Sequence, residues 1–107
     1  MKVAYNGCYG GFGLSEIAMI ELARLKGVDL TGMEYKYSSF ANEDYTKTFD
    51  LPNDRSDKDL ISVIELLGNK ANGMCADLQI EEIPDGASFE ITEYDGFEGV
   101  EPPRQSW

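Results

Sequence analysis

The chain of 107 residues is short and strongly acidic. It holds 20 Asp and Glu residues against nine Lys and Arg residues and no His, which gives a formal net charge of −11. This charge repels nucleic-acid phosphates and anionic lipid, so we expect neither as a direct partner. The hydrophobic content of 42% is that of a folding chain, and the length predicts a single domain over residues 1–107.

Targeting signals and cysteine chemistry are both weak in this sequence. No apolar run approaches the roughly 20 residues of a membrane span, and the apolar start is broken at Gly7, too early for a signal peptide. We therefore expect a cytoplasmic protein. Cys8 and Cys75 form no CxxC pair and are interpreted as small buried residues rather than as a disulfide or metal ligands. The sequence predicts no metal and no cofactor.

The first third of the chain predicts a strand, a glycine-rich loop and a helix. Residues 2–6 have strand character, and residues 7–14 contain four glycines. Ser15 is the predicted N-cap of a helix over residues 17–26, which Gly27 ends. Apolar residues surround most of this helix, so we expect it to be covered on more than one side.

The middle of the chain is less regular until a second helix begins. Residues 28–54 mix aromatic and polar side chains in partial alternation, which predicts one or two short strands with loops. Ser56 and Asp59 resemble a capping box at the start of a helix with amphipathic spacing. Its apolar positions continue to Ala71, and Asn72 with Gly73 ends it.

The last third predicts an antiparallel hairpin and a tail. Residues 76–81 and 89–94 each alternate apolar and polar side chains around a turn at 84–86. Residues 95–107 have no periodicity and predict a turn followed by an extended tail. The predicted fold is α+β, a small mixed β-sheet with two helices in the order β-α-(β)-(β)-α-β-β.

The glycine-rich loop is the first candidate binding site. Backbone N–H groups and the positive end of a helix dipole meet where such a loop enters a helix, and this arrangement suits a phosphate. The spacing matches neither a GxGxxG fingerprint nor a Walker loop. In the alternative interpretation, the glycines only permit a tight turn and the aromatic residues cover the core. The candidate ligand-binding residues are Asn6, Tyr9, Gly10, Gly11, Phe12, Gly13, Ser15, Arg104 and Trp107.

Each of these candidates has an expected role. Gly10, Gly11 and Gly13 would offer backbone donors, and Ser15 would cap the helix and contact the anion. Aromatic rings at Tyr9, Phe12 or Trp107 would stack on a base. Arg104 would neutralise phosphate charge if the tail folds back or crosses to a second subunit. A tail that is disordered or merely packed is the alternative.

The acidic C-terminal third is the second candidate site. Residues 75–107 hold nine acidic residues and only Arg104 as a base. Alternate residues of a strand lie roughly 7 Å apart, which is comparable to phosphate spacing along DNA, so this surface could imitate nucleic acid. The alternative is that the charge only keeps a small protein soluble. The candidate interface residues are Asp77, Glu81, Glu90, Glu93, Asp95 and Glu98.

Catalysis has little support in these residues. A chain without His lacks the usual base near neutral pH, and no other side-chain set indicates a catalytic site. We name no catalytic residue, and hydrolysis stays an unsupported possibility.

Both ends of the chain resemble small uncharacterised proteins encoded in bacteriophages and prophages. The similar segments are residues 5–15, 65–73, 83–85 and 93–96, together with Arg104 and Trp107. Residues 28–54 are not covered, and the resemblance implies a phage origin but no activity. Small phage proteins often counter host defence by sequestering a nucleotide signal or by blocking a nuclease, which is an argument by analogy.

These observations lead to two functional hypotheses. In the first, the chain is a non-catalytic counter-defence protein of the host-cell cytoplasm that sequesters a small, phosphate-bearing immune signal of nucleotide type at the loop from Asn6 to Ser15. In the second, it is an acidic DNA mimic that inhibits a host nuclease, of the anti-CRISPR or anti-restriction kind, or another defence protein. A homo-oligomer that exchanges its tails is compatible with either hypothesis.

Overall fold

The computed structural model describes residues 1–36, 38–74 and 76–102. Its elements, in chain order, are β1 (Lys2–Asn6), α1 (Glu16–Lys26), β2 (Glu34–Tyr35), β3 (Ser39–Ala41), β4 (Thr48–Asp50), α2 (Lys58–Leu67), a short 3-10 helix η1 (Gly68–Ala71), β5 (Leu78–Glu82), β6 (Glu90–Tyr94) and β7 (Phe97–Glu101). The predicted α+β class and the approximate order of elements are confirmed.

The strands form three small sheets, and every pairing between described strands is antiparallel. β1 pairs with β5, β2 and β4 both pair with β3, and β6 pairs with β7. The predicted mixed sheet is therefore wrong in strand direction. Short antiparallel pairs suit this chain because its connections within each sheet, apart from β1 to β5, are brief.

The predicted hairpin of residues 76–81 with 89–94 does not form. β5 instead pairs with β1, where Ala4 lies opposite Ile80. β6 pairs with β7 across a tight turn at Asp95 and Gly96, so residues 97–101 are a strand and not part of a tail. Asp95 has φ 53° and Gly96 φ 86°, and two consecutive positive φ values are typical of the turn that closes a two-residue hairpin.

Helix α1 begins and ends where the sequence predicts. The Ser15 hydroxyl accepts a hydrogen bond from the backbone N–H of Ala18 at 3.2 Å, and Gly27 ends the helix in the left-handed conformation with φ 70°. Its burial is one-sided, however, because Ile17 and Ile20 on the other side stay about half exposed. The predicted cover on more than one side is absent from the described part of the chain.

Helix α2 begins one residue later than predicted. Its N-cap is Asp57, whose carboxylate accepts a hydrogen bond from the backbone N–H of Leu60 at 2.9 Å. Ser56 instead donates its hydroxyl to the Asp54 carboxylate at 2.6 Å. Because Asp57 is both a strong capping residue and a negative charge at the positive end of the helix dipole, it is the better cap of the two neighbours.

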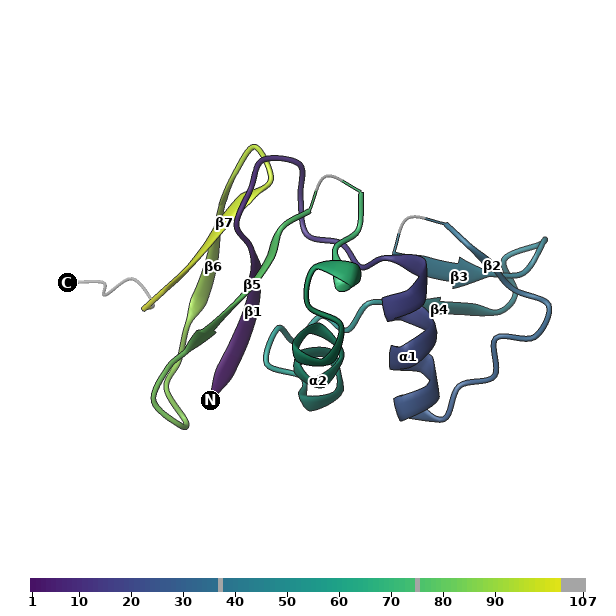
Figure 1. Ribbon diagram of the computed structural model, residues 1–107, viewed down its shortest axis with the longest axis horizontal. Coiled ribbons are helices and arrows are strands. Elements are labelled where there is room, and N and C mark those ends of the chain that lie inside the picture. The colour runs from purple at the N-terminus through teal and green to yellow at the C-terminus, as the bar shows by residue number, and fades with distance from the viewer. Residues whose placement is uncertain (37, 75, 103–107) are drawn as a thin grey trace.

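The core lies where the two helices meet the sheets. Figure 1 shows α1 and α2 in the middle of the molecule, with β1, β5 and the β6–β7 hairpin on one side and β2, β3 and β4 on the other. The largest fully buried side chains are Leu14, Met19, Leu22, Leu60, Val3, Val63 and Asn6. Asn6 is the polar member of this set, and its position leads to the site.

Candidate functional site

The glycine loop, residues 7–14, runs from the end of β1 to the start of α1 along one edge of the molecule (Figure 1). Several of its backbone N–H groups donate within the protein. The backbone N–H of Gly7 donates to the Asp77 carbonyl at 2.7 Å, and that of Gly10 donates to the Asp95 carbonyl at 3.2 Å. Of the three glycines expected to offer donors to a ligand, Gly10 instead ties the loop to the β6–β7 turn, and Gly7 ties the loop to β5.

Ser15 is also committed to internal contacts. Besides capping α1, its hydroxyl donates to the Lys70 carbonyl at 2.6 Å, and its backbone N–H donates to the Ala71 carbonyl at 2.9 Å. Both carbonyls belong to η1, so this 3-10 helix packs against the first turn of α1. The Ser15 hydroxyl, which was expected to contact an anion, therefore contacts η1 of the same chain.

Asn6 is buried at the base of the loop, and its side chain links three segments of the chain. Its side-chain amide donates to the Cys8 carbonyl at 2.6 Å and to the Gly96 carbonyl at 2.7 Å, while its side-chain oxygen accepts from the backbone N–H of Asp77 at 2.8 Å. The residue is fully buried. One side chain thus joins the glycine loop, the start of β5 and the turn of the β6–β7 hairpin.

Gly96 brings the hairpin turn into direct contact with the glycine loop. A Cβ atom placed on Gly96 would overlap the backbone nitrogen of Gly11 and would lie 2.6 Å from that of Gly10. Only a residue without a side chain permits this approach. Gly10 and Gly11 themselves have φ 131° and 100°, so the glycines serve the close packing of two backbones.

A buried ion pair lies beside this contact. The two terminal guanidinium nitrogens of Arg55 donate to the Glu98 carboxylate, at 2.6 Å and 3.0 Å, and the same carboxylate accepts from the backbone N–H of Asn6 at 2.9 Å. The side chains are only 21% and 8% exposed. The guanidinium also stacks on the Phe12 ring, 3.8 Å from its centre. This two-pronged geometry is the strong form of the Arg–carboxylate contact, and it anchors β7 to β1.

The opposite side of the β6–β7 hairpin is acidic and aromatic. We call it the outer face, and it comprises the exposed residues Glu90, Thr92, Tyr94, Phe97 and Glu101. Glu90 is paired across the strands with Glu101, and Tyr94 with Phe97. The exposed fraction is 74% for Tyr94 and 44% for Phe97.

The aromatic part of the outer face is extended by the glycine loop. Tyr9 is 65% exposed, and its ring centre lies 5.4 Å from that of Phe97. Three exposed aromatic rings, those of Tyr9, Tyr94 and Phe97, therefore gather at the tip of the hairpin. We call these three residues the aromatic tip.

The other side of the glycine loop lines a cavity of about 420 Å³. Residues 10–13 form one wall, and the remaining lining residues are Tyr35, Ser38, Ser39, Asp50, Leu51 and Met74. The described lining contains a carboxylate and no Lys or Arg, so it suits hydrogen bonding better than anion binding. A neighbouring cavity of about 530 Å³ shares Tyr35 and Met74 with it and adds Lys36 and Tyr45.

Lys36 supplies a positive charge to the lining of the second cavity. Its ammonium group donates to the Tyr45 hydroxyl at 2.9 Å and lies 4.6 Å from the centre of that ring. The hydrogen bond with Tyr45 raises the pKa of Lys36, so the side chain keeps its charge over the whole physiological range. An anionic group in the second cavity would meet this charge.

The predicted ligand residues thus divide between several structural roles. Tyr9 belongs to the aromatic tip, Phe12 lies under Arg55, and the loop glycines line a cavity and pack against the hairpin turn. Arg104 and Trp107 lie outside the described residues, and their expected roles stay predictions.

The predicted acidic interface is altered at one residue. Glu81, Glu90, Glu93 and Asp95 are exposed, and Asp77 is half-buried. Glu98 is buried and paired with Arg55, which corrects its predicted place on the interaction surface. It lies on the inner side of β7 because successive residues of a strand point to opposite faces, and the neighbours of the outer-face residue Phe97 must face inward.

Sequence reasoning missed Arg55 and two members of the aromatic tip, Tyr94 and Phe97. Arg55 is separated from Glu98 by 43 positions, and no local pattern pairs residues at that distance. The aromatic tip did leave a signal, because aromatic residues on both sides of Asp95-Gly96 are adjacent cross-strand partners if that dipeptide closes a hairpin.

The described residues form neither a cluster suited to a metal ion nor a helix suited to cross a membrane. No group of three or more His, Cys, Asp and Glu side chains in this part of the chain is arranged to hold a metal ion. None of its helices has the length and apolar character needed to cross a membrane.

Comparison with known proteins gives no relative. No protein-family model matches the chain, and it matches no curated protein and no solved structure.

Proposed function

We propose that this chain is a non-catalytic counter-defence protein of phage type that binds a basic surface of a host defence protein, such as the DNA-binding surface of a nuclease, through the outer face and the aromatic tip. One observation carries the proposal. Glu90 and Glu101 lie directly opposite each other on an exposed face that continues into three exposed aromatic rings.

The opposed carboxylates work against folding, and the exposed rings contribute little to it. Like charges directly across two strands are destabilising, and exposed aromatic rings gain little from burial within the chain. A binding surface explains both, because Tyr residues are enriched at the centre of interfaces and carboxylates around them steer a basic partner toward the site.

The anchoring of the hairpin supports the same interpretation. An isolated two-stranded hairpin is at best marginally stable in water. Here Asn6, Gly96 and the Arg55–Glu98 pair fix the inner face of the hairpin to β1 and to the glycine loop. The outer face is therefore presented on a rigid support, which lowers the entropic cost of binding.

The net charge indicates what kind of partner fits. A charge of −11 repels nucleic acid and attracts proteins that bind it. A nuclease surface that has evolved to hold phosphates offers closely spaced Lys and Arg residues, to which Glu90 and Glu101 are complementary. Occupation of that surface blocks DNA without any chemical step.

The test is binding and inhibition by matched variants. The immobilised chain would capture partners from a bacterial lysate, and each captured nuclease would be purified and titrated with the wild-type chain. We expect a double substitution Glu90→Gln/Glu101→Gln, or Tyr94→Ala alone, to weaken affinity by about tenfold or more and to relieve inhibition in parallel.

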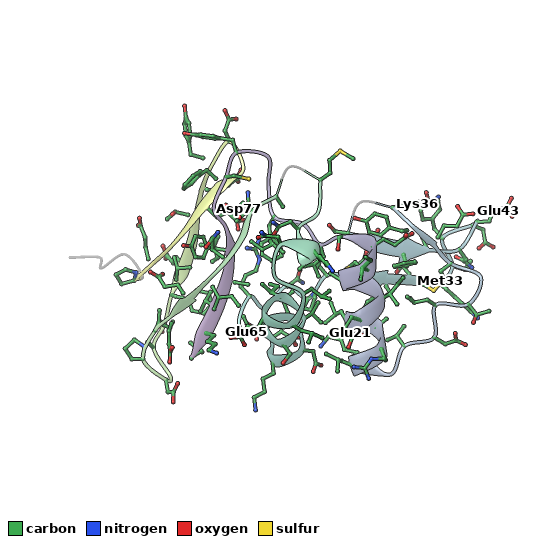
Figure 2. All side chains as sticks on the ribbon, viewed as in Figure 1. Glu21, Met33, Lys36, Glu43, Glu65 and Asp77 are labelled. Atoms are coloured by element: carbon green, nitrogen blue, oxygen red, sulfur yellow. The ribbon has the colours of Figure 1, made fainter. Side chains whose placement is uncertain are left out.

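The matched control removes the same charge elsewhere. Glu34→Gln/Glu43→Gln changes two exposed glutamates in β2 and the β3–β4 loop, and Glu43 lies at the opposite end of the molecule (Figure 2). We expect this variant to bind within about twofold of wild type. Equal effects of both double variants would show that net charge alone acts and would refute the outer face as the interface.

A second candidate function is capture of a small, nucleotide-type ligand in the two cavities that share Tyr35 and Met74. The observation in its favour is that the glycine loop lines one cavity and Lys36 lines the other. A ligand at about 100 times its dissociation constant adds roughly 2.7 kcal/mol to stability, which is visible as a thermal shift with a panel of linear and cyclic nucleotides.

The location of that ligand is tested by charge reversal. Lys36→Glu should abolish a nucleotide-induced shift, and Lys47→Glu, an exposed lysine of the same end, should preserve it. If no nucleotide shifts the transition, this candidate fails and the protein-binding proposal is unaffected.

A further inference from the structure

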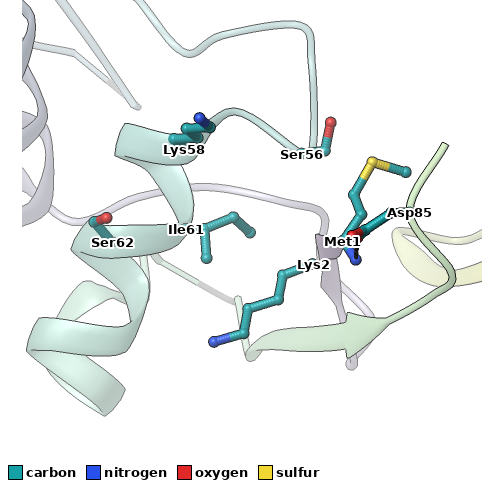
Figure 3. Close-up of a pocket in the computed structure, with 7 residues that line it drawn as sticks. All are labelled: Met1, Lys2, Ser56, Lys58, Ile61, Ser62 and Asp85. Atoms are coloured by element: carbon teal, nitrogen blue, oxygen red, sulfur yellow. Dashed lines mark hydrogen bonds and ion pairs between the residues drawn. The ribbon is translucent and has the colours of Figure 1, made fainter.

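A cleft of about 620 Å³ lies between α2 and the start of β1, and it is larger than either cavity beside the glycine loop. Figure 3 shows its walls. Lys58, Ile61 and Ser62 come from the first turns of α2, and Met1 and Lys2 come from the facing end of the chain. This cleft is separate from the outer face and contains none of the residues discussed above for ligand binding.

The rim of the cleft carries positive charge. Lys58 and Lys2 both line it, although the chain has only nine Lys and Arg residues. Lys58 has no hydrogen-bond or ion-pair partner within residues 1–36, 38–74 and 76–102. It is also the first residue of α2, where a cation opposes the helix dipole. The position of this lysine is thus unfavourable for the helix alone.

Two carboxylates near the rim, those of Asp85 and Glu65, are already engaged in other contacts. Asp85 bonds the amino group of Met1 at 2.6 Å, and Glu65 bonds the ammonium group of Lys2 at 2.7 Å. The hydrogen bond that the Met1 amino group donates to Asp85 lowers the pKa of Asp85, and the hydrogen bond that Lys2 donates to Glu65 raises the pKa of Lys2. The ammonium group of Lys58 remains as the charge available to an incoming anion.

The floor of the cleft is apolar. Ile61 is 7% exposed, and the Met1 side chain is half-buried beside it. Ser62 adds a hydroxyl at the edge. An apolar floor with a small number of polar groups at the rim is the usual composition of a small-molecule site.

We propose that this cleft binds a small amphipathic anion, an apolar body that carries one carboxylate. The body packs on Ile61 and Met1, and the carboxylate pairs with Lys58 at the rim. Phosphate-rich ligands fit less well, because Lys58 is the one unpaired ammonium group among the described lining residues and the Asp85 carboxylate lines the cleft as well.

The test uses octanoate as the probe and the full chain with isotopically labelled isoleucine methyl groups. We expect saturable shifts of the Ile61 methyl signals on addition of octanoate and weaker binding of the neutral analogue 1-octanol. Lys58→Glu should raise the dissociation constant of octanoate by about tenfold or more. Ser62→Trp, which fills the edge of the cleft, should also weaken binding.

Lys70→Glu is the matched control. Lys70 is exposed, lies in η1, and its ammonium group likewise has no partner among the described residues. The Lys70→Glu variant should bind octanoate with a dissociation constant within about twofold of the wild-type value. Lys58→Glu should not lower the melting temperature, since an acidic residue is favourable at a helix N-terminus, so that lost binding is not lost folding. Unmoved Ile61 signals, or equal binding by the two charge reversals, would overturn the proposal.

Discussion

Glu98 is the residue through which β7 of the hairpin is bonded to Arg55 and to the end of β1. Its carboxylate is buried and accepts hydrogen bonds from both terminal nitrogens of Arg55 and from the backbone of Asn6. Burial of an ion pair costs desolvation energy that good geometry only offsets, so its presence is weak support for a stabilising role. Removal of one partner is different, because the remaining charge stays in the protein without compensation.

We therefore expect Glu98→Gln to destabilise the fold by about 3 kcal/mol, near the low end for a broken buried pair because Arg55 keeps some access to water. Urea unfolding of the variant measures this loss. Glu101→Gln on the outer face of the same strand is the control and should change stability by at most about 0.5 kcal/mol. A similar effect of the two substitutions would mean that the Arg55–Glu98 pair does not anchor the hairpin.

At the scale of elements, three turns share one local design. In each, an Asp carboxylate accepts hydrogen bonds from the hydroxyl and the backbone N–H of the Thr or Ser two residues later; the pairs are Asp29 with Thr31, Asp44 with Thr46 and Asp54 with Ser56. Such turns hold the chain just before or between regular elements. In all three turns the pKa of the Asp carboxyl is lowered, chiefly by the hydrogen bond from the Ser or Thr hydroxyl and next by the hydrogen bond from the backbone N–H.

These turns should make the fold acid-sensitive in a defined direction. A carboxyl whose pKa is lower in the folded chain than in the unfolded chain, where it is about 3.9, stabilises the fold fully above that value. This stabilisation is lost as the pH falls below the unfolded-state pKa and then through the lower pKa of the folded chain. We expect the melting temperature to drop as the pH falls below about 4, and Asp54→Asn to reduce that drop. Asp50→Asn, at an exposed carboxyl outside these turns, should leave it unchanged, and an equal reduction by both variants would contradict the assignment.

The sequence predicts the elements of this fold better than their partners. The capping residue Ser15 and the end at Gly27 are local features, and the structure confirms both. The alternation in residues 76–81 and 89–94 identifies strands, yet it carries no information on which edge each strand meets. β5 finds β1 because that strand buries Val3 and Ala4 in the core, whereas β6 needs only the turn at Asp95 and Gly96 to pair with β7.

The candidate site shows the same limit. The glycine loop is visible in the sequence, and it does line a cavity. Its contacts with the hairpin turn depend on Gly96, some 85 residues along the chain from Gly11, and on the Arg55–Glu98 pair. Contacts at such separations arise only when the whole chain folds, so local spacing could not distinguish a phosphate loop from a packing loop.

At the scale of the whole molecule, the charge of −11 works against compaction. Most of the ion pairs between described residues are at least partly open to water, as for Lys2 with Glu65 and Arg24 with Glu21. Exposed pairs contribute about 0–1 kcal/mol each and are weakened by salt. Repulsion among the excess carboxylates extends over the whole surface and is weakened by salt as well, so the net effect of salt reports which of the two is larger.

We expect repulsion to dominate, because 20 acidic residues face only nine basic ones. An increase of NaCl from about 10 mM to about 200 mM shortens the screening length from roughly 30 Å to less than 10 Å and should raise the melting temperature. Glu90→Lys removes two units of excess negative charge and turns the opposed carboxylates into a Lys–Glu pair, so this variant should start from a higher melting temperature at low salt and gain less from added salt. A melting temperature that falls with salt in the wild-type chain would instead show that local ion pairs outweigh the repulsion. In that case the opposed carboxylates of the outer face would cost the fold little, and the stability argument for their role in binding would lose its force.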